Sequence, residues 1–161
     1  MIAKHSAATT LTTPSDREIV VTRVVNAPRR LVFEVYTNPE HVLQWMTGPA
    51  GWIMPICEID LRPGGAWRFV WCRDDGTEMA MSGRYTEIVP PERLVSTESW
   101  GAGLPETLNT LLLSEQYGKT TITQRLLFPS KETRDAALQT GMLEGMSTTY
   151  ERLDDYLATI A

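Results

Sequence analysis

One change of periodicity constrains the fold of this chain more than any other feature. Between residues 56 and 128, apolar and polar residues alternate in short runs, and turn-forming residues stand between the runs. From residue 130 to residue 161, apolar residues recur at intervals of three and four. Alternation is typical of half-buried strands, and the second spacing is typical of one face of a helix. The pattern predicts antiparallel strands followed by one long C-terminal helix capped by Ser130.

Six strands are predicted in the alternating region, over residues 56–62, 66–73, 77–89, 93–101, 107–116 and 120–128. A seventh strand is predicted at residues 17–26, which are rich in Val and Ile. Two short helices should follow that strand, since Pro28 and the triplet Asn38-Pro39-Glu40 suit helix starts. The second helix should end near Met46, before a Gly- and Pro-rich loop at residues 47–55. Residues 1–15 are expected to form a flexible N-terminal tail, and residues 16–161 a single domain.

Composition argues against several functional classes. The net charge is −5 and the 15 Lys and Arg residues are scattered, so a nucleic-acid partner is not expected. Two Cys without a CxxC pair and two His argue against a structural zinc site. The sequence has no long apolar run, no phosphate-binding glycine loop and no nucleophile motif, so we expect a cytoplasmic protein without membrane association or cofactor. His41, alone on its predicted helix, is expected to be structural or solvent-facing rather than a catalytic base.

The turn Pro63-Gly64-Gly65 predicts how two strands pair. A three-residue hairpin loop would place Arg62 opposite Ala66 and set the register of both strands. The predicted pairs on one face are Leu61 with Trp67, Ile59 with Phe69, and Cys57 with Trp71. On the other face Asp60 would lie opposite Arg68. Cys57 and Cys72 would point to opposite faces and could not form a disulfide, as expected in a reducing compartment.

The alternating Trp67, Phe69 and Trp71 could either fill a core or line a cavity. A seven-stranded antiparallel sheet is broad and must curl, whereas one helix is only about 10 Å wide. We therefore expect an apolar cavity between sheet and helix. Gly141 and Gly145 disfavour a helix, and either close packing, a kink or a ligand near the backbone would explain them.

Four segments resemble one known family, and they appear in the order typical of that family. They are VNAPRRLVFEVYTNPEHVLQW (25–45), PICEIDLRPGGAWRF (55–69), GRYTEIVPPERLVSTESW (83–100) and TGMLEGMSTTYERLDDYL (140–157). Together they resemble the activator of heat-shock-protein-90 ATPase homologue-like family of the SRPBCC or START superfamily. The resemblance implies the α+β helix-grip fold of the birch-pollen allergen, in which a curved seven-stranded antiparallel sheet holds a long C-terminal helix. It also implies a domain of a superfamily whose members bind lipids, sterols, polyketides or hormones, or act as cyclases.

Glu98 is the most informative polar residue, but the sequence leaves its direction open. If Ile88 faces Leu94, Arg84 pairs with Glu98, and we expect this pair on the outer face. If Glu87 faces Leu94, Tyr85 meets Ser96, and Glu98 enters the concave side opposite Gly83. An inward Glu98 would need a partner and could bind a polar or cationic group. Gln124 interrupts an apolar face, where it could satisfy a backbone group or offer an amide to a ligand.

The function predicted from these observations is binding of a small hydrophobic or aromatic molecule between sheet and helix, without assigned chemistry or catalytic residues. One rival is a cyclase or dehydratase that uses Glu98 and Tyr85. Another is a protein-interaction module of the co-chaperone kind or a homodimer, which would show a large exposed apolar patch. The predicted ligand-binding residues are Trp45, Trp52, Trp67, Phe69, Trp71, Met81, Tyr85, Glu98, Trp100, Gln124, Met142, Met146 and Tyr150.

Overall fold

The computed structural model describes residues 9–48, 50–101 and 105–161. Its strands are β1 (Thr10–Thr12), β2 (Glu18–Val25), β3 (Trp52–Ile59), β4 (Ala66–Arg73), β5 (Glu78–Val89), β6 (Arg93–Glu98), β7 (Thr107–Gln116) and β8 (Lys119–Leu127). Its helices are α1 (Arg29–Thr37), α2 (Pro39–Trp45), α3 (Lys131–Leu138) and α4 (Met142–Ile160). Within the described residues, none of these helices is long and apolar enough to cross a membrane.

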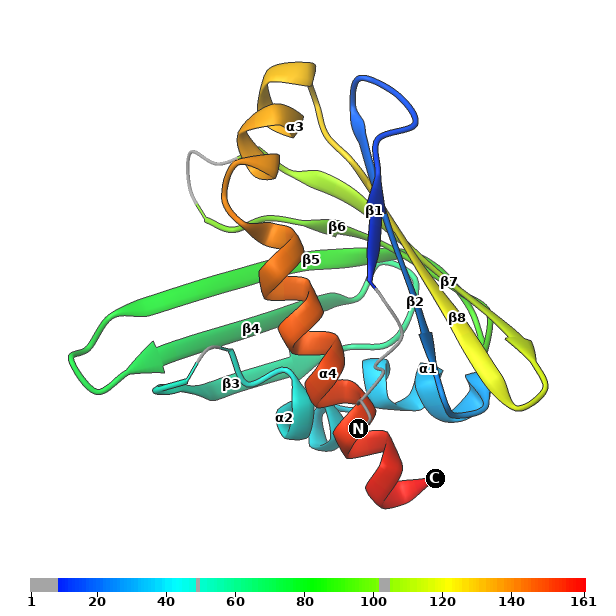
Figure 1. The fold of residues 1–161 in the computed structure, drawn as a ribbon. Helices are drawn as coiled ribbons and strands as arrows, with labels where there is room; N and C mark the ends of the chain where they lie inside the picture. The colour runs from blue at the N-terminus through cyan, green and yellow to red at the C-terminus, as the bar shows by residue number, and fades with distance from the viewer. Residues whose placement is uncertain (1–8, 49, 102–104) are drawn as a thin grey trace, which may run out of the picture.

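The strands form one antiparallel sheet in the order β1-β2-β8-β7-β6-β5-β4-β3. The sheet curves, and α4 crosses its concave side while α1 and α2 lie at one end (Figure 1). The predicted helix-grip architecture is thereby confirmed, with eight strands among the described residues rather than seven. The sheet and the helices form separate parts of the structure. They share one core, which lies on the concave face of the sheet.

The additional strand corrects the prediction of a flexible tail over residues 1–15. β1 pairs with β2, with Leu11 opposite Val21, and the partly buried Leu11 packs against the core. Thr9 Oγ1 also accepts a hydrogen bond of 2.8 Å from the buried Arg23. An edge strand of three residues gains its stability from the neighbouring strand, and the Thr-rich sequence suits it. The remaining part of that prediction, residues 1–8, lies outside the described residues.

The short helices begin where the Pro and Asn signals predict. Asn38 caps α2, and its side chain accepts a hydrogen bond of 3.0 Å from the backbone N–H of Glu40. At the other end of α2, the indole of Trp45 is 1 % exposed and donates to the carbonyl of Val35 over 3.0 Å. This hydrogen bond fixes α2 against α1 and satisfies the only polar atom of a buried side chain.

The C-terminal segment is two helices, where a single long helix was predicted. Ser130 caps α3 as expected, in a reciprocal capping box with Thr133. The break comes at Gly141, whose φ of +76° is a left-handed conformation that favours glycine. Because Leu138 and Met142 keep helical spacing across the break, periodicity alone could not reveal it.

The pairing of β3 with β4 keeps the predicted faces but not the predicted register. Ile59 lies opposite Trp67 and Cys57 opposite Phe69, two residues from the predicted pairing. The turn is wider because Gly64 N–H donates to Tyr85 O and Gly65 O accepts from Tyr85 N–H, which ties the turn to β5. A Cβ on Gly65 would lie 2.0 Å from the Asp60 carbonyl oxygen, so only glycine fits there.

Other details of this hairpin also differ from the prediction. β3 begins at Trp52, inside the predicted loop 47–55, and Glu58 rather than Asp60 lies opposite Arg68. Asp60 forms an ion pair with Arg62 instead. Pro55 is compatible with β3 because β3 is an edge strand.

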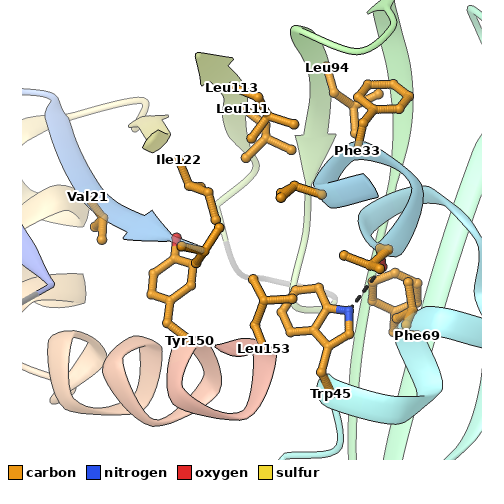
Figure 2. Close-up of a cluster of buried hydrophobic side chains, with 14 of the residues drawn as sticks. Val21, Phe33, Trp45, Phe69, Leu94, Leu111, Leu113, Ile122, Tyr150 and Leu153 are labelled. Atoms are coloured by element: carbon orange, nitrogen blue, oxygen red, sulfur yellow. Dashed lines mark hydrogen bonds between the residues drawn. The ribbon is translucent and has the colours of Figure 1, made fainter. Parts of the chain in front are cut away.

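The core joins the concave face of the sheet to α2 and α4. Figure 2 shows Tyr150 and Leu153 of α4 directed toward Val21 and Ile122 of the sheet, with Trp45 beside Leu153. Val21, Ile122 and Leu153 are fully buried. Burial of side chains from three layers is the main stabilising contribution expected for this architecture.

Candidate ligand-binding site

The hairpin between β5 and β6 decides the direction of Glu98. Near the turn, Ile88 lies opposite Leu94; beyond a β-bulge between Tyr85 and Glu87, Tyr85 lies opposite Ser96. Each of the two registers considered from the sequence is therefore correct for one part of the hairpin. A bridge between Ser82 and Ser99 continues the second register and places Glu98 opposite Gly83.

Glu98 consequently lies on the concave face. Its face is shared by Leu94, which is buried in the core, and by Ser96. The neighbouring residues Thr97 and Ser99 point to the convex side, where they line a hollow of about 400 Å³ over β4, β5 and β6. The alternative pairing of Glu98 with Arg84 on the outer face is thus wrong.

The Glu98 carboxylate accepts two hydrogen bonds from neutral donors. Asn109 Nδ2 donates to Oε1 over 3.1 Å, and Trp100 Nε1 donates to Oε2 over 3.0 Å. Among the described residues, no Lys, Arg or His forms a salt bridge with it. Burial raises the pKa of Glu98, and the hydrogen bonds from Trp100 and Asn109 offset this only in part. The site therefore holds a partly buried carboxylate that has no cationic partner among the described residues.

Two buried polar atoms beside Glu98 have no hydrogen-bond partner in the described part of the chain. They are Nε1 of Trp67 and Oδ1 of Asn109. Trp67 is 5 % exposed and lies opposite Gly83, which is itself opposite Glu98 on the next strand. A Cβ on Gly83 would lie 2.8 Å from Trp67 Nε1, so the indole N–H lies over the glycine. Buried polar groups are nearly always paired, with protein or with ordered water, so this free donor and this free acceptor are the atoms that a bound molecule would pair with.

Aromatic rings continue from this point along β4. The centroids of Trp67 and Phe69 are 5.0 Å apart, and those of Phe69 and Trp71 are 6.1 Å apart. Trp100 stacks on Trp71 with centroids 6.0 Å apart and planes inclined by 14°, and it remains 41 % exposed. Trp71 donates from its indole to the Met46 carbonyl, so its ring is fixed in place. The Glu98 end of the concave face is therefore bordered by an aromatic wall that is partly open.

The helix side of the site comes from α4. Tyr150 is buried and donates a hydrogen bond of 2.5 Å to Gln124 Oε1 on β8. Gln124 thus bonds a side chain of α4, which is neither of the two roles considered for it from the sequence. Met146 and Met142 precede Tyr150 by one and two turns and are partly buried against the core. α4 runs antiparallel to β8 (Figure 1), so these Met residues lie toward the end of the sheet that holds Glu98.

The predicted ligand-binding residues fall into separate groups. Glu98, Trp100, Trp67, Phe69 and Trp71 lie together on the concave face, as does Met81, which is paired with Phe69. Trp45 is part of the packing between helices, and the ring of Trp52 lies against Arg73, 5.2 Å from its guanidinium carbon. The sequence reasoning missed Asn109, although its inward position follows from continuing the register of β6 into β7, where it lies opposite Ser96.

The two best-defined hollows of the described residues do not correspond to the expected cavity. One hollow is the convex one described above, and the other is bordered by residues 15–17 and Leu127. Neither lies between the sheet and α4. The concave side is densely packed around Trp45 and Leu153, whereas Glu98, Asn109 and the Met residues remain partly exposed.

Glu98 faces inward, as the enzymatic rival requires, but no hydrogen bond joins it to Tyr85. Tyr85 lies opposite Ser96 rather than Glu98, and the carboxylate bonds Asn109 and Trp100 instead. Burial raises the pKa of Tyr85 far above its ordinary value of 10.0, so its phenol stays protonated. Within the described residues, no group of three His, Cys, Asp or Glu could hold a metal ion.

A second polar contact joins the sheet to the C-terminal half of α4. Arg23 of β2 is 2 % exposed and forms an ion pair of 2.5 Å with Asp154 of α4. Its guanidinium carbon also lies 6.0 Å from the centre of the Tyr150 ring. These contacts hold α4 to the sheet, which is a structural role.

Comparisons with solved structures agree with this architecture. A protein from Rhodobacter sphaeroides is similar with a TM-score of 0.88 and 27% identity, covering 96% of this chain and 100% of that chain. A protein from Nitrosomonas europaea is similar with a TM-score of 0.80 and 24% identity, covering 91% and 97%. A comparison with curated proteins finds no match. The family model described as Activator of Hsp90 ATPase homolog 1-like protein matches residues 26–158, and the chain therefore belongs to that family.

Proposed function

We propose that the protein binds a small hydrophobic or aromatic molecule between the sheet and α4, at the end of the concave face that holds Glu98. Family and fold are those of a helix-grip domain of the general ligand-binding kind. The observation that carries the proposal is the pair of unpartnered atoms, Trp67 Nε1 and Asn109 Oδ1, beside the Glu98 carboxylate. Each such atom costs about 1–3 kcal/mol when left unpaired in a buried place, and a ligand that pairs with both would recover that cost.

The surrounding side chains suit an apolar ligand body. Trp67, Phe69 and Trp71 offer ring surface, and Met81, Met142 and Met146 are partly buried nearby. Methionine side chains adapt to irregular shapes because they are unbranched and polarisable. A ligand could therefore enter with modest rearrangement of Met side chains while the rings stay fixed.

The rival functions have weaker support. The enzymatic rival uses Glu98 and Tyr85 together, and the Glu98 carboxylate is hydrogen-bonded to Asn109 and Trp100 rather than to Tyr85. The interaction module needs a contiguous apolar surface, yet strongly exposed apolar residues such as Ile53 and Tyr117 belong to separate elements. A cytoplasmic location remains part of the proposal, supported by the free thiols of Cys57 and Cys72.

Two measurements test the proposal. Native mass spectrometry of protein purified from its host should show a small bound molecule that is released on unfolding. Titration with the neutral aromatic probe prodan, which carries a carbonyl acceptor, should give a blue-shifted, saturable emission. Trp67→Phe removes the free N–H and should weaken prodan binding about threefold to tenfold. Trp52→Phe is the matched control and should leave prodan binding unchanged. Purified protein that holds no small molecule and does not change the emission of prodan would contradict the proposal.

A further inference from the structure

We propose that the ligand carries a protonated amine, which donates hydrogen bonds to Glu98 and to Asn109 Oδ1 and lies against the indole rings of the aromatic wall. This inference rests on the proposed function and names the chemical class of its ligand. It follows from what the Glu98 end of the concave face lacks among the described residues, which is a positive charge beside Glu98 and a donor for Asn109 Oδ1.

The first argument is the unused capacity of the carboxylate. An ionised carboxylate has about four lone-pair positions, and Asn109 and Trp100 occupy one on each oxygen of Glu98. Both donors are neutral, so the negative charge is not compensated by a cation within the described residues. A partly buried charge without a counterion is costly, and a cationic ligand removes that cost.

The second argument is the orientation of Asn109. Its Nδ2 donates to the carboxylate, which fixes the side-chain amide so that Oδ1 is the atom left free. An ammonium group carries several N–H donors and can serve Glu98 and Asn109 Oδ1 at once. A ligand that offers only acceptors would leave Oδ1 unpaired, and its acceptor atoms would be repelled by the carboxylate charge.

The third argument comes from the rings. Trp100 bonds Glu98 through its indole N–H and stacks on Trp71, so one indole meets the carboxylate and a second indole lies against that ring. Indole faces attract cations, most strongly where water is excluded. Trp67 Nε1 remains as a donor for an acceptor atom of the same ligand, such as a hydroxyl or carbonyl oxygen.

The test uses three probes with the same naphthalene ring: 2-naphthylmethylamine, 2-naphthylmethanol and 2-naphthoate, titrated calorimetrically at pH 7. The amine should bind about tenfold or more tightly than the alcohol, because charge-assisted hydrogen bonds are roughly twice as strong as neutral ones. The carboxylate probe should bind weakest. In a ¹⁵N–¹H spectrum, the amine should shift the indole signals of Trp67 and Trp100.

Matched variants separate the site from general attraction to a chain of net charge −5. Glu98→Gln should remove the preference for the amine, whereas Glu106→Gln makes the same change of charge beside the convex hollow and should keep it. Asn109→Ser is a second variant, which keeps the carboxylate and should weaken amine binding.

The outcomes distinguish the two proposals. Equal binding of amine and alcohol that Glu98→Gln leaves unchanged would overturn the amine assignment while supporting the binding function. Equal losses in the Glu98 and Glu106 variants would also overturn it, since the attraction would then be general. Absence of binding by all three probes, together with no response to prodan, would overturn both proposals.

Discussion

Gly83 of β5 lies directly opposite Trp67 of β4, and the indole covers the glycine. A Cβ at this position would meet Trp67 Nε1 at 2.8 Å and the Thr97 carbonyl oxygen at 1.8 Å. The second contact involves backbone, which cannot rotate away. The absence of a side chain at Gly83 therefore allows β6 to approach closely and the indole N–H to lie between β4 and Glu98.

Gly83→Ala should accordingly destabilise the protein by about 1–3 kcal/mol, the usual cost of inserting an atom into a filled site. Chemical denaturation followed by Trp fluorescence measures the change. A variant as stable as the wild type would show that the Thr97 carbonyl can move without cost and would contradict the close approach.

For Gly145→Ala we expect the opposite effect, an increase in stability. A Cβ on Gly145 would meet nothing within 4 Å, and the residue lies in the interior of α4. Ala is favoured over Gly in a helix by about 1 kcal/mol, so the variant should be more stable by about that amount. Thermal unfolding should show a raised Tm. Unchanged or lowered stability would contradict the open space beside Gly145.

The ion pair between Arg23 and Asp154 should be important for holding α4 against the sheet. Asp154→Ala leaves Arg23, which is 2 % exposed, without its carboxylate partner. Removing one partner of a buried pair costs about 3–5 kcal/mol, and the partial exposure of Asp154 places the expected loss at the lower end. Denaturation of Asp154→Ala, Arg23→Met and the double variant measures the coupling. Additive losses would show that the two side chains act independently.

The sequence predicts the faces of the strands better than their registers. Alternation of Trp67, Phe69 and Trp71 correctly places all three on the concave face, because a strand exposes every second residue to one side. The register with β3 is missed because Gly64 and Gly65 bond the backbone of Tyr85, a contact distant in sequence. Local turn chemistry cannot reveal such a contact.

The direction of Glu98 and the break before α4 escape sequence reasoning for different reasons. A bulge between Tyr85 and Glu87 joins two registers in one hairpin, and each register alone is consistent with the pattern of apolar residues. The break at Gly141 preserves the helical spacing on either side of it. Asn109 escapes for the same reason as Glu98, because its inward position follows only once the direction of the neighbouring strand residues is known.

The pH dependence of stability provides a direct measure of the uncompensated carboxylate. Burial raises the pKa of Glu98 in the folded protein above its ordinary value of 4.5. The folded state then binds the proton more tightly than the unfolded state, so protonation of Glu98 stabilises the fold. This contribution is fully present below pH 4.5 and is lost as the pH rises through the raised pKa of the folded state.

Glu98→Gln should remove this dependence. The amide carries no charge. If the Asn109 side-chain amide turns over, the Gln N–H can bond Asn109 Oδ1 in place of the present bond from Nδ2, while the Gln oxygen still accepts from Trp100, so the ligand-free variant should be more stable than the wild type at pH 7. The difference between them should shrink as the pH falls toward 4.5, since the wild-type carboxyl is then neutral as well. Denaturation curves at pH 4.5, 5.5, 6.5 and 7.5, with Glu106→Gln as the control of equal charge, measure the effect. A wild type that exceeds Glu98→Gln in stability at pH 7 would mean that the Trp100 and Asn109 hydrogen bonds outweigh the cost of burying the charge.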